Sequence, residues 1–209
     1  QIPLNSNWVG LPDVMSEAEV RIPGFAELSD QNGGLPLLFN AQNAAHYLVN
    51  YSEDLAHKVM SNLSTYDAVT KVQLIQSALK LAEGGLSEYA DLGSLLANCR
   101  NESSKVVNAA ISQALNALKI FIDEASESET EFKSFVDQLF NAQYKRLGWD
   151  KIPGESVNDE QLRVLPISWE VYAEDADALA KASEIFEAHN SDIHTIPADI
   201  RQVVLKNQI

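Results

Sequence analysis

The spacing of the apolar residues changes once along the chain, about a quarter of the way from its start. Before the change, Ala, Val and Ile alternate with charged residues over residues 18–22, and Pro23-Gly24 ends the segment. Alternation with a period of two is typical of a strand that buries one face. Two further apolar segments, residues 35–40 and 46–51, follow turn-forming residues. We therefore predict three short antiparallel strands, too few to close a sandwich, and expect residues 1–51 to be part of a β-sandwich domain.

From residue 52 onward, apolar residues recur every three or four positions, which is the spacing of an amphipathic helix. The clearest case is residues 103–124, where Val107, Ala110 and Ile111 begin an apolar stripe that continues at this spacing. The same pattern predicts helices over residues 64–84, 87–99, 128–148, from 158 onward, 175–189 and 197–206. Capping patterns mark three of the starts, namely Ser64 with Asp67, Ser128 with Glu131, and Asn158 with Gln161.

Helices that follow one another with short polar loops and no strand between them indicate an α-solenoid or an irregular superhelix, HEAT-like in architecture. A strict repeat of roughly 34 to 47 residues is not found in the sequence. We therefore expect a mainly α protein with two parts. Residues 1–51 would be a partial antiparallel β-sandwich, and residues 52–209 an incomplete α-helical C-terminal domain.

Composition and charge narrow the classes of partner. The chain has 209 residues, of which 45% are hydrophobic, enough to build a core. Its formal net charge of −15 repels phosphate groups, so we expect neither a nucleic-acid partner nor a membrane partner. The single cysteine, Cys99, favours a reducing compartment. The chain begins with Gln1 rather than with methionine, and we expect it to be part of a longer protein.

Residue patterns suited to catalysis or metal binding are sparse. A zinc site of the His-Glu-x-x-His type needs two imidazoles one helical turn apart, with a glutamate between them. The four histidines, His46, His57, His189 and His194, contain no such pair. Glycine-rich phosphate loops, Gly-x-Ser-x-Gly elbows and Cys-x-x-Cys pairs are also missing. We therefore assign no catalytic and no metal-binding residue, and the substrate-binding residues stay unassigned.

Two segments combine a helix end with turn residues but contain no nucleophile or base. They are LGWDKIPGES, residues 147–156, and IPADIR, residues 196–201. We interpret both as structural junctions. Acidic pairs such as Asp175 with Asp177 lie in polar connections, and we interpret them as solvated.

Four segments, in this order, resemble the region that follows the catalytic domain in the aminopeptidase N family. They are QIPLNSNW, PLLFNAQNAAHYLVNYS, LGWDKIPGES with the helix after it, and IPADIRQVVLKN. The family consists of zinc enzymes that remove N-terminal residues from peptides, and its bacterial cytosolic members are the most similar. The resemblance implies the end of a β-sandwich followed by an all-helical domain that curves over the active site and encloses a chamber. It also implies that the zinc and its ligands belong to the parent enzyme and lie outside this chain.

Two functions follow from these observations. The chain is expected to be a cytoplasmic, non-catalytic C-terminal fragment of a zinc aminopeptidase that forms the chamber wall and is inactive alone. Its partners would then be the peptide substrate and the missing catalytic domain. The alternative is a stand-alone helical-repeat adaptor that binds a peptide or protein partner. Acidic residues on a chamber wall would attract peptide ammonium groups, although solubility is the simpler explanation of the charge.

Overall fold

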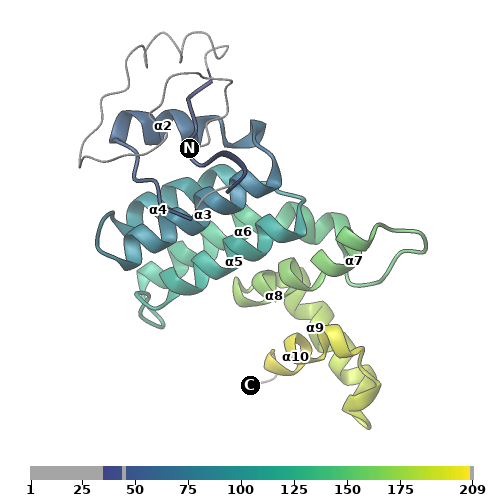
Figure 1. Ribbon diagram of the computed structural model, residues 1–209. Coiled ribbons are helices and arrows are strands. Elements are labelled where there is room, and N and C mark those ends of the chain that lie inside the picture. Colours follow the sequence, from purple (N-terminus) through teal and green to yellow (C-terminus); the bar gives the residue numbers. More distant parts are fainter. Residues whose placement is uncertain (1–34, 44–45, 208–209) are drawn as a thin grey trace, which may run out of the picture. The chain divides into compact units, whose positions relative to one another are not determined.

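The computed structural model describes residues 35–43 and 46–207, which are mainly helical (Figure 1). The chain divides into two compact units, one up to Asn98 and one from Cys99 onward. Among the described residues of the first unit, the helices are α2 (Glu53–Ser61), α3 (Ala68–Glu83) and α4 (Tyr89–Leu96), with 3₁₀ turns η1 (Ala41–Asn43) and η2 (Leu63–Thr65). A third turn, η3 (Ala97–Cys99), spans the boundary. The domain boundary predicted after residue 51 stays a prediction.

The second unit contains six α-helices among its described residues. They are α5 (Lys105–Lys119), α6 (Glu127–Leu147), α7 (Val157–Leu162), α8 (Val164–Tyr172), α9 (Ala176–His189) and α10 (Ala198–Lys206), with the turn η4 (Ile193–Thr195) before α10. The mainly α fold class is thereby confirmed. None of the described helices combines the length and the apolar composition that a membrane span requires.

The β-sandwich portion is not shown in the described residues. The first predicted strand, residues 18–22, lies outside them. Within residues 35–40 only Phe39 makes an isolated bridge, and residues 46–51 contain no strand. The prediction of strands over these two segments was therefore wrong.

Left-handed backbone ends the first of these two segments. Asn40, Gln42 and Asn43 have φ values of 57°, 58° and 53°, which an extended strand does not allow. The segment instead packs on helix α3, where the Gln73 amide donates a hydrogen bond of 3.4 Å to the carbonyl oxygen of Phe39. Leu37 and Leu38 are consecutive and both buried, whereas residues 46–50 are largely exposed. Periodicity alone does not separate a short apolar run that is buried against a helix from one that is buried in a sheet.

In the first unit, α3 packs against α4. Helix α3 begins where the Asp67 carboxylate accepts a hydrogen bond of 2.8 Å from the backbone amide of Thr70. Ser64, which the sequence indicated as the cap, lies in η2 instead. The helix ends at Gly84 as predicted, and its buried face includes Leu74 and other apolar residues. The cap of α3 is therefore Asp67, three residues after the predicted cap Ser64.

The core of the second unit is built around α6 and α8, which form its most extensive helix pair. The Phe140 ring of α6 stacks on Trp169 of α8, with ring centroids 6.0 Å apart and planes 6° from parallel. Trp169 also donates a hydrogen bond of 2.8 Å from its indole nitrogen to the Ser112 hydroxyl on α5. Helices α8, α9 and α10 pack together with the end of α6 and the turn before α10, and the buried cluster there consists of Tyr144, Ile167, Ala178, Ile196, Ile200, Val203 and Val204.

Two predicted helices of the second unit have different bounds in the structure. The helix expected over residues 103–124 ends at Lys119, and the next two residues, Ile120 and Phe121, are exposed. The helix expected from Asn158 onward begins after the cap Ser156, and Arg163 divides it into α7 and α8. Asn158 is therefore not a helix cap.

Candidate functional site

The four histidines lie on separate elements. His57 is on α2, His189 ends α9, His194 is in η4, and His46 precedes α2. His189 Nδ1 lies 2.8 Å from the carbonyl oxygen of Ile185, one turn earlier on its own helix. No two histidines share a helix in the part of the chain that the structure describes, so these residues do not fit a His-Glu-x-x-His zinc site.

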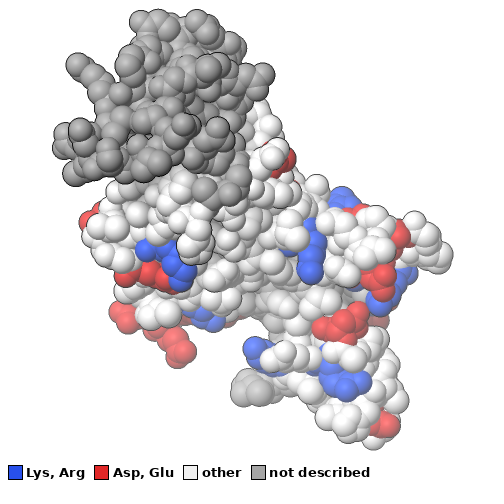
Figure 2. All heavy atoms as spheres, viewed as in Figure 1, with Lys and Arg blue, Asp and Glu red and all other residues white. Residues whose placement is uncertain are grey.

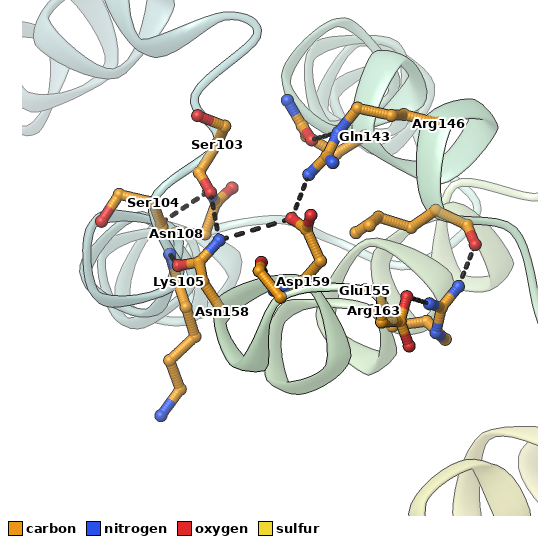
Figure 3. A network of polar contacts seen from close by, with 12 residues as sticks. Ser103, Ser104, Lys105, Asn108, Gln143, Arg146, Glu155, Asn158, Asp159 and Arg163 are labelled. Carbon is orange, nitrogen blue, oxygen red and sulfur yellow. Dashed lines mark hydrogen bonds and ion pairs between the residues drawn. The ribbon is translucent and has the colours of Figure 1, made fainter. Parts of the chain in front are cut away.

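The segment 147–156 is held at both ends by one buried arginine, Arg163, which is 1% exposed (Figure 3). Its guanidinium donates hydrogen bonds to the carbonyl oxygens of Leu147 and Gly148, where α6 ends. It also forms an ion pair with the carboxylate of Glu155, just before α7. Arg163 therefore fixes both ends of the segment that joins α6 to α7, as expected of a structural junction.

A second set of polar contacts lies beside this junction and joins α5, α6 and α7 (Figure 3). The Asn158 side chain accepts a hydrogen bond of 2.9 Å from the Lys105 amide and donates one of 2.9 Å to the Ser103 carbonyl oxygen. Arg146 on α6 pairs with Asp159 on α7 at 2.6 Å. The hydrogen bond from this guanidinium lowers the pKa of Asp159 to about 2. These contacts connect helix ends, which is a structural role.

The segment 196–201 is fixed in a similar way. Arg201 donates hydrogen bonds of 2.8 Å to the carbonyl oxygens of His194 and Ile196. The Ile196 side chain is fully buried in the core of the second unit. This second junction therefore has a packing role as well.

Three carboxylates from three elements meet in the second unit, and the sequence did not single out this group. They are Asp137 on α6, Glu170 on α8 and Asp175, the cap of α9. One oxygen of each lies within 4.8 Å of an oxygen of the other two. Glu170 is 0% exposed, and neither of its carboxylate oxygens has a hydrogen-bond partner. We refer to Asp137, Glu170 and Asp175 as the carboxylate cluster.

Burial and like charge act together on Glu170. Burial is the main cause that raises the pKa of Glu170 to about 8, and the charge of Asp137 adds to it. The Asn141 amide lies near and offsets part of the rise, while its own hydrogen bond of 2.8 Å goes to Asp137. An ionised Glu170 therefore requires a positive charge that the described side chains around it do not supply.

The sequence contained one usable signal for the carboxylate cluster. Glu170 follows Ile167 by three residues and therefore shares its buried helix face, where a glutamate is out of place. Asp175 was interpreted as solvated, but it is half-buried and its Oδ1 accepts a hydrogen bond of 2.9 Å from the Ala178 amide. Asp177, its supposed partner, accepts a hydrogen bond of 2.7 Å from the Tyr144 hydroxyl. The solvated interpretation was wrong for Asp175.

The first unit contains a cavity of about 400 Å³ between α2, α3 and α4. Its walls are largely apolar, with three acidic residues, Glu53, Glu88 and Asp91, and no lysine or arginine among the described lining residues. A volume of this size is in the range of small-ligand sites. On the face shown in Figure 2, by contrast, acidic and basic side chains are interspersed.

Comparison with known proteins identifies the family. The sequence model of the ERAP1-like C-terminal domain family matches residues 36–209. The chain belongs to this family. Aminopeptidase N of Lactococcus lactis subsp. lactis (strain IL1403) is 48% identical over 208 residues, which cover 100% of this chain and 25% of the relative. Aminopeptidase N of Lactobacillus helveticus is 34% identical over 209 residues, covering 100% of this chain and 24% of the relative.

More distant relatives also align. The alanine/arginine aminopeptidase of Saccharomyces cerevisiae is 25% identical over 167 residues, which cover 79% of this chain and 20% of that protein. The chain thus spans about a quarter of the length of the curated relatives that it matches in full. The resemblance to the C-terminal part of aminopeptidase N is confirmed, and the chain corresponds to that region of an aminopeptidase.

Proposed function

We propose that this chain is the non-catalytic C-terminal part of a cytoplasmic, zinc-dependent aminopeptidase that removes N-terminal residues from peptides. Its helices would form a superhelical wall of the chamber in which the peptide is held. The observation that carries the proposal is the alignment of the whole chain with a quarter of aminopeptidase N at 48% identity. The peptide and the catalytic domain would be its partners.

The described residues themselves support a division of labour. Zinc would supply the activation of a water molecule in the parent enzyme. Because no two histidines of the described part share a helix, we derive no step through zinc from this chain. What the chain offers is a set of helices whose junctions are fixed by the buried Arg163 and the half-buried Arg201, which suits a rigid wall.

Turnover of an aminoacyl p-nitroanilide tests the proposal. The purified chain, with zinc added, should release no nitroaniline above the rate in buffer, whereas full-length aminopeptidase N of Lactococcus lactis serves as the active control. Zinc-dependent turnover by the chain that is removed by a chelator and restored by zinc would overturn the non-catalytic role.

The cavity of the first unit is the observation that favours the alternative function, a peptide-binding adaptor. Its acidic lining would suit the ammonium group of a peptide. Fluorescence anisotropy with a labelled short peptide, compared with the same peptide acetylated at its N-terminus, distinguishes the two functions. An adaptor should bind the free peptide in the micromolar range and the acetylated one more weakly, and Glu53→Gln should weaken binding. A wall that acts only within the whole enzyme should bind neither.

A further inference from the structure

We propose that Asp137, Glu170 and Asp175 bind a hard divalent cation, Ca²⁺ in preference to Mg²⁺, which joins α6, α8 and the start of α9. The proposal rests on two independent observations. Three carboxylates from separate elements converge, with one oxygen of each within 4.8 Å of the others. In addition, Glu170 is completely buried in this group, and both of its oxygens lack a hydrogen-bond partner.

The spacing of the oxygens fits a single ion. Ca²⁺ binds oxygen ligands at roughly 2.4 Å, so two of its ligands are at most about 4.8 Å apart. Mg²⁺ binds at about 2.1 Å and demands a nearly ideal octahedron, which three side chains from three elements meet less easily. Carboxylate oxygens are the ligands of hard cations, and the carboxylate cluster contains no histidine or cysteine that would favour zinc.

Each carboxylate has an oxygen left for the ion. Asp137 uses Oδ1 to accept a hydrogen bond from Asn141, and Asp175 uses Oδ1 to accept one from the Ala178 amide. The Asp175 amide donates a hydrogen bond of 3.0 Å to the carbonyl oxygen of Glu170, which fixes the positions of these two residues relative to each other. The site is therefore held in place by its own backbone and by neighbouring side chains.

The charges near Glu170 also favour a cation. The groups that act most strongly on it, apart from burial, are Asp137 and Asp175, both acidic, and the neutral amide of Asn141. Lys133, one helical turn before Asp137, is engaged with Glu129 and Glu174 at 3.2 and 2.6 Å. Three carboxylates in a buried place repel one another, and a divalent ion would offset both the repulsion and the loss of hydration.

Calorimetric titration of the 209-residue chain tests the site directly. The chain is first treated with EDTA and dialysed, and CaCl₂ or MgCl₂ is then added at constant ionic strength and neutral pH. We expect one saturable Ca²⁺ site per chain, weaker Mg²⁺ binding, and a rise in the unfolding temperature of several degrees in saturating Ca²⁺. Terbium luminescence excited through tryptophan gives a second readout, because Trp169 is next to Glu170.

Substitutions distinguish Ca²⁺ binding at the carboxylate cluster from a general effect of the negative charge of the chain. Glu170→Gln keeps the shape of the side chain and should weaken Ca²⁺ binding about tenfold or more. Asp137→Asn, at a half-buried position, should do the same and serves if the first variant folds poorly. The matched control is Glu187→Gln, an exposed position on α9, which removes the same charge and should leave binding unchanged.

Two results would overturn the proposal. One is the lack of a saturable site at millimolar Ca²⁺, which would indicate that Glu170 stays protonated beside Asp137. The other is equal affinity in the Glu170→Gln and Glu187→Gln variants, which would assign the effect to net charge. Tighter binding of Mg²⁺ would overturn the preference for Ca²⁺. None of these readouts involves peptide hydrolysis, so the outcome is independent of the proposed function.

Discussion

Arg163 and Glu170 are both almost completely buried, and their surroundings differ. The Arg163 guanidinium donates to two carbonyl oxygens and to the Glu155 carboxylate, so its charge is paired and only its Nε has no hydrogen-bond partner. The Glu170 carboxylate has no hydrogen-bond partner and faces two further acids. A buried charge is costly unless it is paired. Arg163 is therefore expected to stabilise the fold, whereas Glu170 points to a missing partner.

Replacing Arg163 should destabilise the chain strongly. Arg163→Met leaves the Glu155 carboxylate and the Leu147 carbonyl oxygen without their donor, and the expected loss of unfolding free energy is about 3–5 kcal/mol. Arg163→Lys keeps the charge but loses the planar fork of donors, so an intermediate loss is expected. Urea unfolding followed by circular dichroism measures both changes.

The control for this prediction is Arg146→Met in the neighbouring set of contacts. The Arg146 side chain is 42% exposed in its pair with Asp159, so solvent screens the interaction and the loss should be much smaller. Equal losses for the two methionine variants would contradict the role given to Arg163.

At the scale of the elements, the start of α6 shows how a capping pattern is used. The Ser126 hydroxyl accepts a hydrogen bond of 3.1 Å from the Glu129 amide, and the Glu129 carboxylate accepts one of 2.7 Å from the Ala125 amide. The arrangement differs from a capping box in that Glu129 accepts from the amide of the residue before the cap and not from that of Ser126 itself. It lies two residues before the pair predicted from the sequence, Ser128 with Glu131.

Removing the correct cap should therefore cost more than removing the predicted one. Ser126→Ala is expected to lower the free energy of unfolding by about 1 kcal/mol, because the Glu129 amide loses its acceptor. Ser128→Ala, two residues away on an exposed position, should cost clearly less. Thermal unfolding of the two variants compares them directly, and a larger effect of Ser128→Ala would place the cap where the sequence suggested.

Helix periodicity predicted most of the described elements, and it failed where two signals compete. The helices around Ile111 and Val136 were expected because apolar residues recur at the helical spacing over several turns. The caps of α6 and α7 were each predicted two residues too late, because serine and acidic residues occur repeatedly near the start of both helices. The segment around Phe39 was misread as a strand because a short continuous apolar run can be buried on a helix as well as in a sheet. These errors come from short segments, in which tertiary contacts override local preference.

The candidate sites were harder to predict than the fold. The role of Arg163 was not predicted, because its acceptors at the end of α6 are backbone carbonyl oxygens, which carry no sequence signature. The carboxylate cluster depends on the packing of α6 against α8. Asp137 lies 33 residues before Glu170 and 38 residues before Asp175, and the fold brings the three together. A single sequence does not specify such a meeting point.

At the scale of the whole molecule, the second unit has a core of its own. Residues 99–209 supply the Phe140–Trp169 stack and the buried cluster around Ile167 and Val204. A domain that contains its own apolar core can fold alone. The unit is therefore expected to be independent in folding, whatever its role in the longer enzyme.

Expression of residues 99–209 alone tests this expectation. The fragment should be helical by circular dichroism and should unfold cooperatively in urea, and Phe140→Ala in it should cost about 3–5 kcal/mol by opening a cavity beside Trp169. A fragment of residues 120–209 is the control, because it lacks α5, which packs on α7 and α8, and it should be markedly less stable. A fragment of residues 99–209 without cooperative unfolding would contradict the prediction.

The junction held by Arg163 has a practical consequence for protein engineering. Both ends of the segment that joins α6 to α7 are bound to the same side chain, whereas residues 151–154 between them are exposed. Exposed loop tips between fixed ends accept inserted sequence most readily. A peptide tag or a fluorescent reporter placed there would extend outward without altering the helices, and would label the chain at a defined point.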